Sequence, residues 1–62
     1  MTTGELQEFW YAVRECGFES KNMLSNREID RLVRALEDAR NYTLADKVAK
    51  MDRAYIVDLI QR

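Results

Sequence analysis

Residues 24–40 read LSNREIDRLVRALEDAR, and this stretch decides the fold class. It opens with a capping box, since Ser25 and Glu28 stand three positions apart and each side chain can accept a hydrogen bond from the other residue's backbone amide. Leu24, just before the box, can pack against Ile29 and fix the direction in which the chain enters a helix. Apolar residues then recur every three or four positions, which predicts one amphipathic helix over residues 26–40. Its apolar face holds Ile29, Leu32, Val33, Leu36 and Ala39.

A helix is also predicted before this stretch, over residues 3–16. Thr2 and Glu5 repeat the spacing of a capping box, and Gly17 stands where a left-handed residue commonly ends a helix. The apolar stripe of this helix holds Leu6, Phe9, Trp10, Val13 and Cys16.

The third predicted helix covers residues 44–61, with a weaker start signal in Thr43 and Asp46. The chain has no proline and only two glycines, so little interrupts the helical pattern. The helix predicted over residues 44–61 carries two neighbouring apolar stripes, which together are wider than packing against one other helix requires. The first holds Leu44, Val48, Met51, Tyr55 and Leu59, and the second holds Ala45, Ala49, Ile56 and Ile60.

These elements predict an all-α, single-domain fold over residues 1–62. We expect a three-helix bundle in which helices 26–40 and 44–61 form an antiparallel hairpin and helix 3–16 packs across it. A chain of 62 residues buries only about 60% of its unfolded surface. With one cysteine and no histidine, neither an intramolecular disulfide nor a structural zinc site can add stability. Either unusually good helix packing or self-association must then supply the stability, and we expect a homo-oligomer.

Charge and composition narrow the function classes. Ten basic and eleven acidic residues give a net charge of −1, which argues against both a nucleic-acid binder and an acidic DNA mimic. No apolar run is long enough to cross a membrane, and the first residues lack the pattern of a signal peptide. We expect a soluble, cytoplasmic protein.

The sequence offers no catalytic, metal-binding or cofactor constellation. Histidine, the most common acid–base residue near neutral pH, is absent. Cys16 lacks a histidine to activate it and falls on an apolar stripe, which favours a buried structural thiol. The two glycines stand alone and form no phosphate-binding loop. We therefore do not expect an enzyme.

One aromatic residue of helix 3–16 lies off the apolar stripe. Tyr11 falls among Gln7 and Arg14 on the face that a monomer shows to water. Because exposed aromatic residues beside arginine are frequent interface hot spots, we predict a partner-binding surface of Tyr11, Gln7, Arg14 and Trp10. The alternatives are that Trp10 anchors the core and that Tyr11 is an isolated exposed aromatic without a role.

The wide apolar face of helix 44–61 suggests self-association. In a three-helix bundle Ile56, Ile60 and Val57 are expected to be exposed, and a second copy can cover them. Asp52 falls between the two apolar stripes, where it either pairs with an arginine, lies at a subunit boundary or faces solvent. The alternative is that helix 3–16 and residues 18–25 cover the whole face.

Basic residues on helix 26–40 suggest a further site. Arg27, Arg31 and Arg34 can bind an anion, such as a nucleotide, if an oligomer gathers them into one pocket. They alternate with acidic residues, so a solvated, charge-balanced surface is the other interpretation.

Residues 39–48, ARNYTLADKV, resemble two helical hairpins. One is found in the C-terminal tail of cysteinyl-tRNA synthetases, where an Asp-aromatic-x-x-Ala-Asp-x-Ile-Arg pattern opens the second helix; the other is the UVR hairpin of excision-repair proteins. Here Asn41 replaces the acidic residue and Ala49 replaces the arginine of the synthetase pattern. The resemblance implies an antiparallel hairpin with Tyr42 and Ala45 packed at its turn.

Taken together, these features predict a small non-enzymatic interaction protein that self-associates and binds a partner protein as an inhibitor or regulator. In size and style it resembles many small phage-encoded proteins that bind a host factor. The alternative is an oligomer that sequesters a small anionic ligand such as a nucleotide between subunits. A nucleic-acid-binding helical module is a weaker alternative.

Overall fold

The structure is a computed structural model that describes residues 2–61. Over this range it is all-helical, with α1 at Thr3–Cys16, α2 at Asn26–Asp38, α3 at Tyr42–Lys50 and α4 at Arg53–Gln61. The all-α class is thus confirmed. The expectation of three helices is wrong, because the segment predicted as one helix over residues 44–61 forms two.

The first two helices begin at the predicted capping boxes. At α1, the Thr2 hydroxyl accepts a hydrogen bond from the Glu5 amide at 3.2 Å, and the Glu5 carboxylate accepts one from the Thr2 amide. At α2, the Glu28 carboxylate accepts from the Ser25 amide at 2.8 Å, and the Ser25 hydroxyl accepts from the Glu28 amide. These short-range bonds satisfy amides that have no partner inside the helix.

Both helices end in a left-handed residue. Gly17, with φ of 74°, ends α1 as predicted, and the following Phe18 amide donates to the Val13 carbonyl at 2.9 Å. The last turn of α2 closes in the same way at Arg40, where φ is 61°. The Asn41 amide then donates to the Leu36 carbonyl at 2.9 Å. The helical conformation therefore stops at Asp38 rather than at residue 40.

The start of α3 differs from the prediction. The Asn41 side chain, not that of Thr43, accepts a hydrogen bond from the Leu44 amide at 3.4 Å, so the helix begins two residues earlier than expected. The residues at the turn also differ from the hairpin that the resemblance implied. Ala45 is buried, but Tyr42 is 63% exposed.

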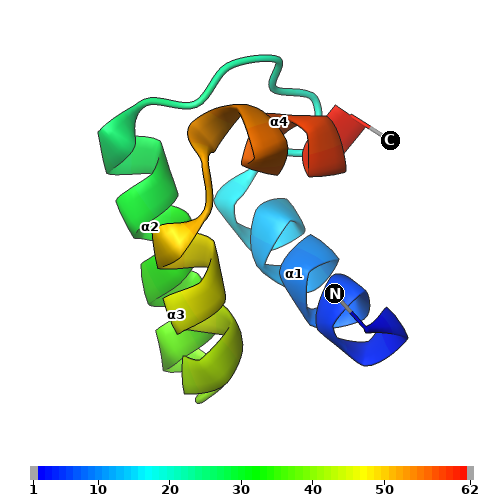
Figure 1. Cartoon of the computed structure of the whole chain (residues 1–62), viewed down its shortest axis with the longest axis vertical. Helices are drawn as coiled ribbons and strands as arrows, with labels where there is room; N and C mark the ends of the chain where they lie inside the picture. Colours follow the sequence, from blue (N-terminus) through cyan, green and yellow to red (C-terminus); the bar gives the residue numbers. More distant parts are fainter. Residues whose placement is uncertain (1, 62) are drawn as a thin grey trace.

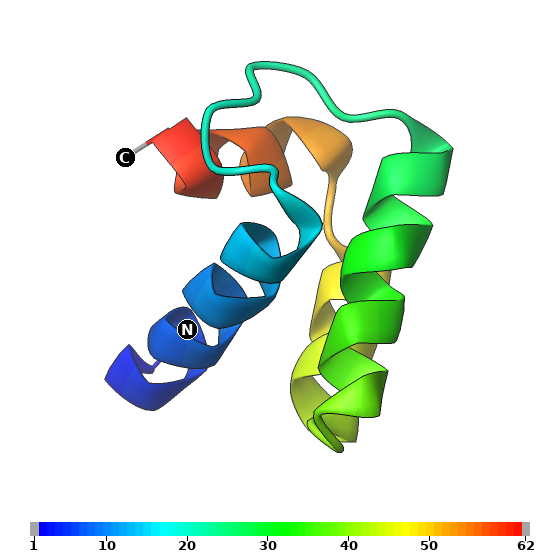
Figure 2. The ribbon, with the colours of Figure 1, turned by 180° about the vertical axis from the view of Figure 1, so that it is seen from behind.

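The four helices pack around one core. In both ribbon views α2 and α3 run side by side and antiparallel, as predicted, and α1 lies beside them at an angle (Figures 1 and 2). α1 packs mainly on α2. α4 lies across one end, beneath the connection from α1 to α2. The core collects side chains from every helix, with Phe9, Leu32, Leu36, Leu44, Val48 and Ile56 among its most buried members.

Candidate functional site

All four residues predicted to bind a partner lie along one groove, which has a volume of about 430 Å³. All of its lining residues belong to α1. Most of them lie on one flank of the helix, because positions three, four or seven residues apart share one side. We call this feature the α1 groove. It is lined by Thr3, Leu6, Gln7, Glu8, Trp10, Tyr11 and Arg14.

The α1 groove contains two kinds of side chain. Some are apolar and packed against the core, and one is an exposed aromatic ring. Leu6 and Trp10 are half-buried and pack against the core, so each leaves only part of its surface to the solvent. Tyr11 is 72% exposed, as predicted. Tyr11 also lines a smaller cleft between α1 and α2. A partner that covers this ring therefore contacts the flank of α1 on both sides of it.

Two unpaired charges border the α1 groove. Arg14 and Glu8 are exposed, and neither forms an ion pair within residues 2–61. They are six positions apart, which corresponds to about 9 Å along the axis of α1. The groove thus has a positive charge at its Arg14 end and a negative charge at Glu8, near the middle of its length.

Sequence reasoning placed Leu6 only in the core and did not single out Thr3 or Glu8. The available signal was the position of Leu6 four residues before Trp10, which puts both side chains at the same edge of the apolar stripe. A residue at the edge of such a stripe contacts the core with one side and solvent with the other.

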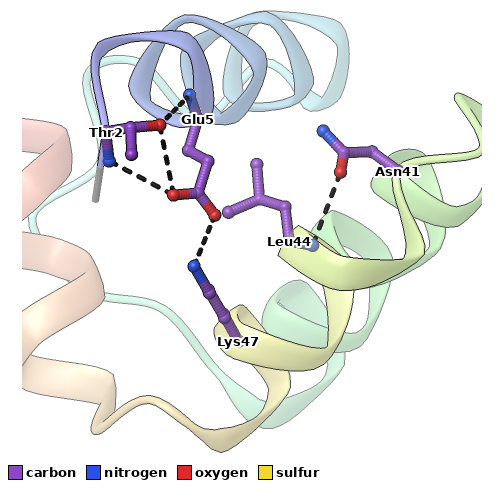
Figure 3. Close-up of polar contacts among 5 residues, drawn as sticks. All are labelled: Thr2, Glu5, Asn41, Leu44 and Lys47. Atoms are coloured by element: carbon purple, nitrogen blue, oxygen red, sulfur yellow. Dashed lines mark hydrogen bonds and ion pairs between the residues drawn. The ribbon is translucent and has the colours of Figure 1, made fainter.

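An ion pair fixes the first turn of α1, where Thr3 and Leu6 line the groove. The Lys47 ammonium of α3 donates to the Glu5 carboxylate at 2.6 Å (Figure 3). This bond, assisted by the hydrogen bond from the Thr2 amide, lowers the pKa of Glu5 from 4.5 to about 2. The carboxylate that caps α1 therefore also ties it to α3.

The residues predicted for self-association do not form an exposed face. Ile56 and Ile60 are 0% and 2% exposed, so the expectation that they lie on the surface is wrong. The cause is the break before α4, which turns these side chains into the core of the same chain. Val57 is half-buried. Self-association itself stays a prediction, but its expected surface is absent from the described part of the chain.

Asp52 does not lie between two apolar stripes, because no helix runs through it. It is exposed and precedes α4, and its carboxylate accepts a hydrogen bond from the Ala54 amide at 3.3 Å. The Asp52 carbonyl accepts from the amides of Tyr55 and Ile56. Its role in this structure is to cap α4, rather than to pair with an arginine across a buried interface.

The three arginines predicted to bind an anion also lie together, in a second groove of about 810 Å³. Arg27, Arg31 and Arg34 are exposed there, and none forms an ion pair with another described residue. Four carboxylates line the same groove: Glu15, Asp30, Glu37 and Asp38. The arginines thus meet a charge-balanced surface, and anion binding stays a prediction.

Cys16 lies in this second groove and is half-buried, where full burial was expected. Its Sγ donates to the Arg31 carbonyl at 3.8 Å. Burial raises the pKa of the thiol, and the nearby Arg31 charge offsets this only in part. The thiol therefore stays protonated at neutral pH, which makes it a poor nucleophile.

No cluster of three or more histidine, cysteine or acidic side chains within residues 2–61 is arranged to hold a metal ion. In the same range, no helix has the length and apolar character required to span a membrane. Comparison with known proteins finds no matching family model, no matching curated protein and no matching solved structure.

Proposed function

We propose that this protein is a non-enzymatic regulator or inhibitor that binds a partner protein through the α1 groove. The observation that carries the proposal is the grouping of exposed Tyr11 with half-buried Leu6 and Trp10 on one flank of a single helix. Tyrosine, tryptophan and arginine are the residues most enriched among interface hot spots. Half-buried apolar side chains lose little rotamer freedom on binding, because the core already holds them.

The charges of the groove define the chemistry of the partner. Arg14 at one end favours a carboxylate, and Glu8, near the middle of the groove, favours a basic group. An apolar side chain between these two charges can contact Trp10 and Tyr11. The expected ligand is therefore a polypeptide segment with an acidic, an apolar and a basic residue in that order along the groove.

The length of the groove indicates a short segment. Thr3 and Arg14 are eleven residues apart, or about 16 Å along the helix axis. About five residues of extended chain cover that distance. Such a contact is smaller than a standard protein interface, so we expect an affinity in the micromolar range.

Selection from a random peptide library tests the proposal. Wild-type protein should enrich peptides with the acidic–apolar–basic pattern, and Tyr11→Ala should weaken their binding about tenfold or more, as expected for a hot spot. Arg14→Ala should weaken binding of the peptides that carry the carboxylate.

The chain offers matched controls for both substitutions. Tyr42→Ala removes another exposed tyrosine, from α3, and Arg34→Ala removes another exposed arginine, from α2. Both variants should bind like the wild type. The proposal is wrong if no peptide is enriched, or if the control variants lose binding to the same extent as Tyr11→Ala and Arg14→Ala.

Binding of a small anion is a second candidate, supported by the grouping of Arg27, Arg31 and Arg34 in one groove. A thermal-shift screen against nucleotides tests it, because a ligand at one hundred times its dissociation constant adds about 2.7 kcal/mol of stability. Melting temperatures that stay constant across all nucleotides would remove this candidate and leave the first unaffected.

A further inference from the structure

The chain turns sharply between α3 and α4 at two residues, neither of which is a residue type that usually interrupts a helix. Met51 is extended, with φ of −75° and ψ of 149°, and Asp52 is the residue directly before α4. We call these two residues the hinge. Neither glycine nor proline is present in it, although these residues cause most sharp interruptions of helices.

The sequence on both sides of the hinge is compatible with one continuous helix. The apolar stripe of Leu44, Val48 and Met51 continues at helical spacing in Tyr55 and Leu59. Alanine, lysine, methionine and arginine, which dominate residues 49–54, are among the best helix formers. Apart from Asp52, which is a favoured N-cap residue, the local preference of this segment thus opposes the turn that it makes.

Two polar contacts and the burial of α4 keep the hinge bent. The Asp52 carboxylate caps α4 through the Ala54 amide at 3.3 Å. Arg53 donates to the Asn26 side chain at 2.7 Å and so ties the start of α4 to the start of α2. The larger contribution comes from Ile56 and the other buried side chains of α4, Leu59 and Ile60.

A straight helix over residues 42–61 would extend beyond the present outline of the monomer. Twenty residues of α-helix span about 30 Å, whereas the longest extent of the molecule is 26 Å. Straightening would move α4 away from the end of the core that it covers in Figures 1 and 2 and expose its buried face. A second copy in the same state offers an α4 of identical shape and an identical uncovered core.

We propose that two copies of this chain exchange α4, by straightening at Met51–Asp52, and form a symmetric dimer. Exchange of an identical element repeats the contacts of α4 with the core, so no new complementary surface is needed. The continuous helix gains backbone hydrogen bonds across the hinge, and the loss of the Asp52 cap opposes it. Removal of this cap should therefore shift the balance toward the dimer.

Two substitutions at the hinge act in opposite directions. Asp52→Ala removes the cap and adds a strong helix former. In the bent form, Arg53→Pro places proline at the first position of α4, where proline is tolerated. In the straight form, the same proline lies in the middle of the continuous helix and disrupts it. The double variant Asp52→Ala/Arg53→Pro is therefore expected to be locked in the bent form. Asp52→Ala/Arg53→Ala controls for the lost hydrogen bond to Asn26.

Light scattering behind a sizing column, over a range of protein concentrations, measures the outcome. Asp52→Ala should reach twice the chain mass of 7.3 kDa at a protein concentration at least about tenfold lower than the wild type needs. The proline-containing double variant should return to the monomer mass, and its alanine control should remain dimeric. The proposal is overturned if Asp52→Ala stays monomeric, if it unfolds without dimerising, or if the dimer persists with proline at position 53.

Discussion

Arg40 occupies a backbone conformation that suits glycine. Its φ of 61° lies in the left-handed region, where a side chain costs roughly 1–2 kcal/mol. Hydrogen bonds on both sides hold Arg40 in this conformation. The Arg40 and Asn41 amides donate to carbonyls of the last turn of α2, and the Asn41 side chain caps α3. A tight link between two antiparallel helices leaves the chain few other conformations.

Replacement of Arg40 by glycine should therefore stabilise the fold. The Arg40 side chain is exposed and forms no ion pair within residues 2–61, so little is lost with it. We expect Arg40→Gly to raise the free energy of unfolding by about 1 kcal/mol, or the melting temperature by about 4–8 °C. Arg40→Ala should leave both nearly unchanged. A melting temperature for Arg40→Gly at or below that of the wild type would contradict this interpretation of the turn.

The two capping glutamates should make stability sensitive to acid. Lys47 lowers the pKa of Glu5 from 4.5 to about 2, and Lys21 lowers the pKa of Glu28. Because the folded pKa of each lies below its unfolded value, the stabilising contribution is fully present above pH 4.5. The part due to Glu5 is lost as the pH falls from 4.5 toward 2.

Thermal melts between pH 7 and pH 2 check this effect. Glu5→Gln should melt lower than the wild type at pH 7, and the difference should shrink as the pH falls below 4.5. Glu19→Gln, an exposed change in the connection after α1, serves as the control and should melt in parallel with the wild type. A constant difference between Glu5→Gln and wild type at every pH would show that the ion pair does not contribute.

At the scale of the helices, short-range signals were sufficient for α1 and α2 but not for the end of the chain. Each capping box joins residues three positions apart, so the sequence contains the whole interaction. The break at Met51–Asp52 depends instead on the burial of Ile56 and its neighbours against the other helices. A straight and a broken helix share the same apolar spacing, so the pattern could not separate them.

The placement of α4 changes the expected effect of truncating Ile56. On an exposed face Ile56→Ala would alter association and leave the fold intact. Because Ile56 is fully buried, the substitution should instead lower the free energy of unfolding by about 2–5 kcal/mol.

Val57→Ala is the control, since Val57 belongs to the same helix and is only half-buried. It should cost much less stability, as measured by chemical denaturation. Equal, small effects of both substitutions would mean that α4 does not close the core.

At the scale of the whole molecule, the grouping of the candidate-site residues follows from the sequence more directly than the position of the expected self-association face. Tyr11, Gln7, Arg14 and Trp10 lie together because one regular helix holds all four, and helical periodicity alone fixes their flank. The expected self-association face required the orientation of one helix against three others. That orientation depends on the hinge, where the apolar spacing is equally compatible with one straight helix.

The fluorescence of Trp10 tests the binding proposal most directly, because it is the only tryptophan of the chain and lies in the α1 groove. A peptide with the acidic–apolar–basic pattern should shift its emission to shorter wavelength in a saturable way, as the ring loses contact with water. Tyr11→Ala should weaken this response about tenfold or more, and Tyr42→Ala should preserve it. An emission spectrum that stays unchanged while calorimetry shows the same peptide binding would contradict the proposal, because the partner would then bind elsewhere.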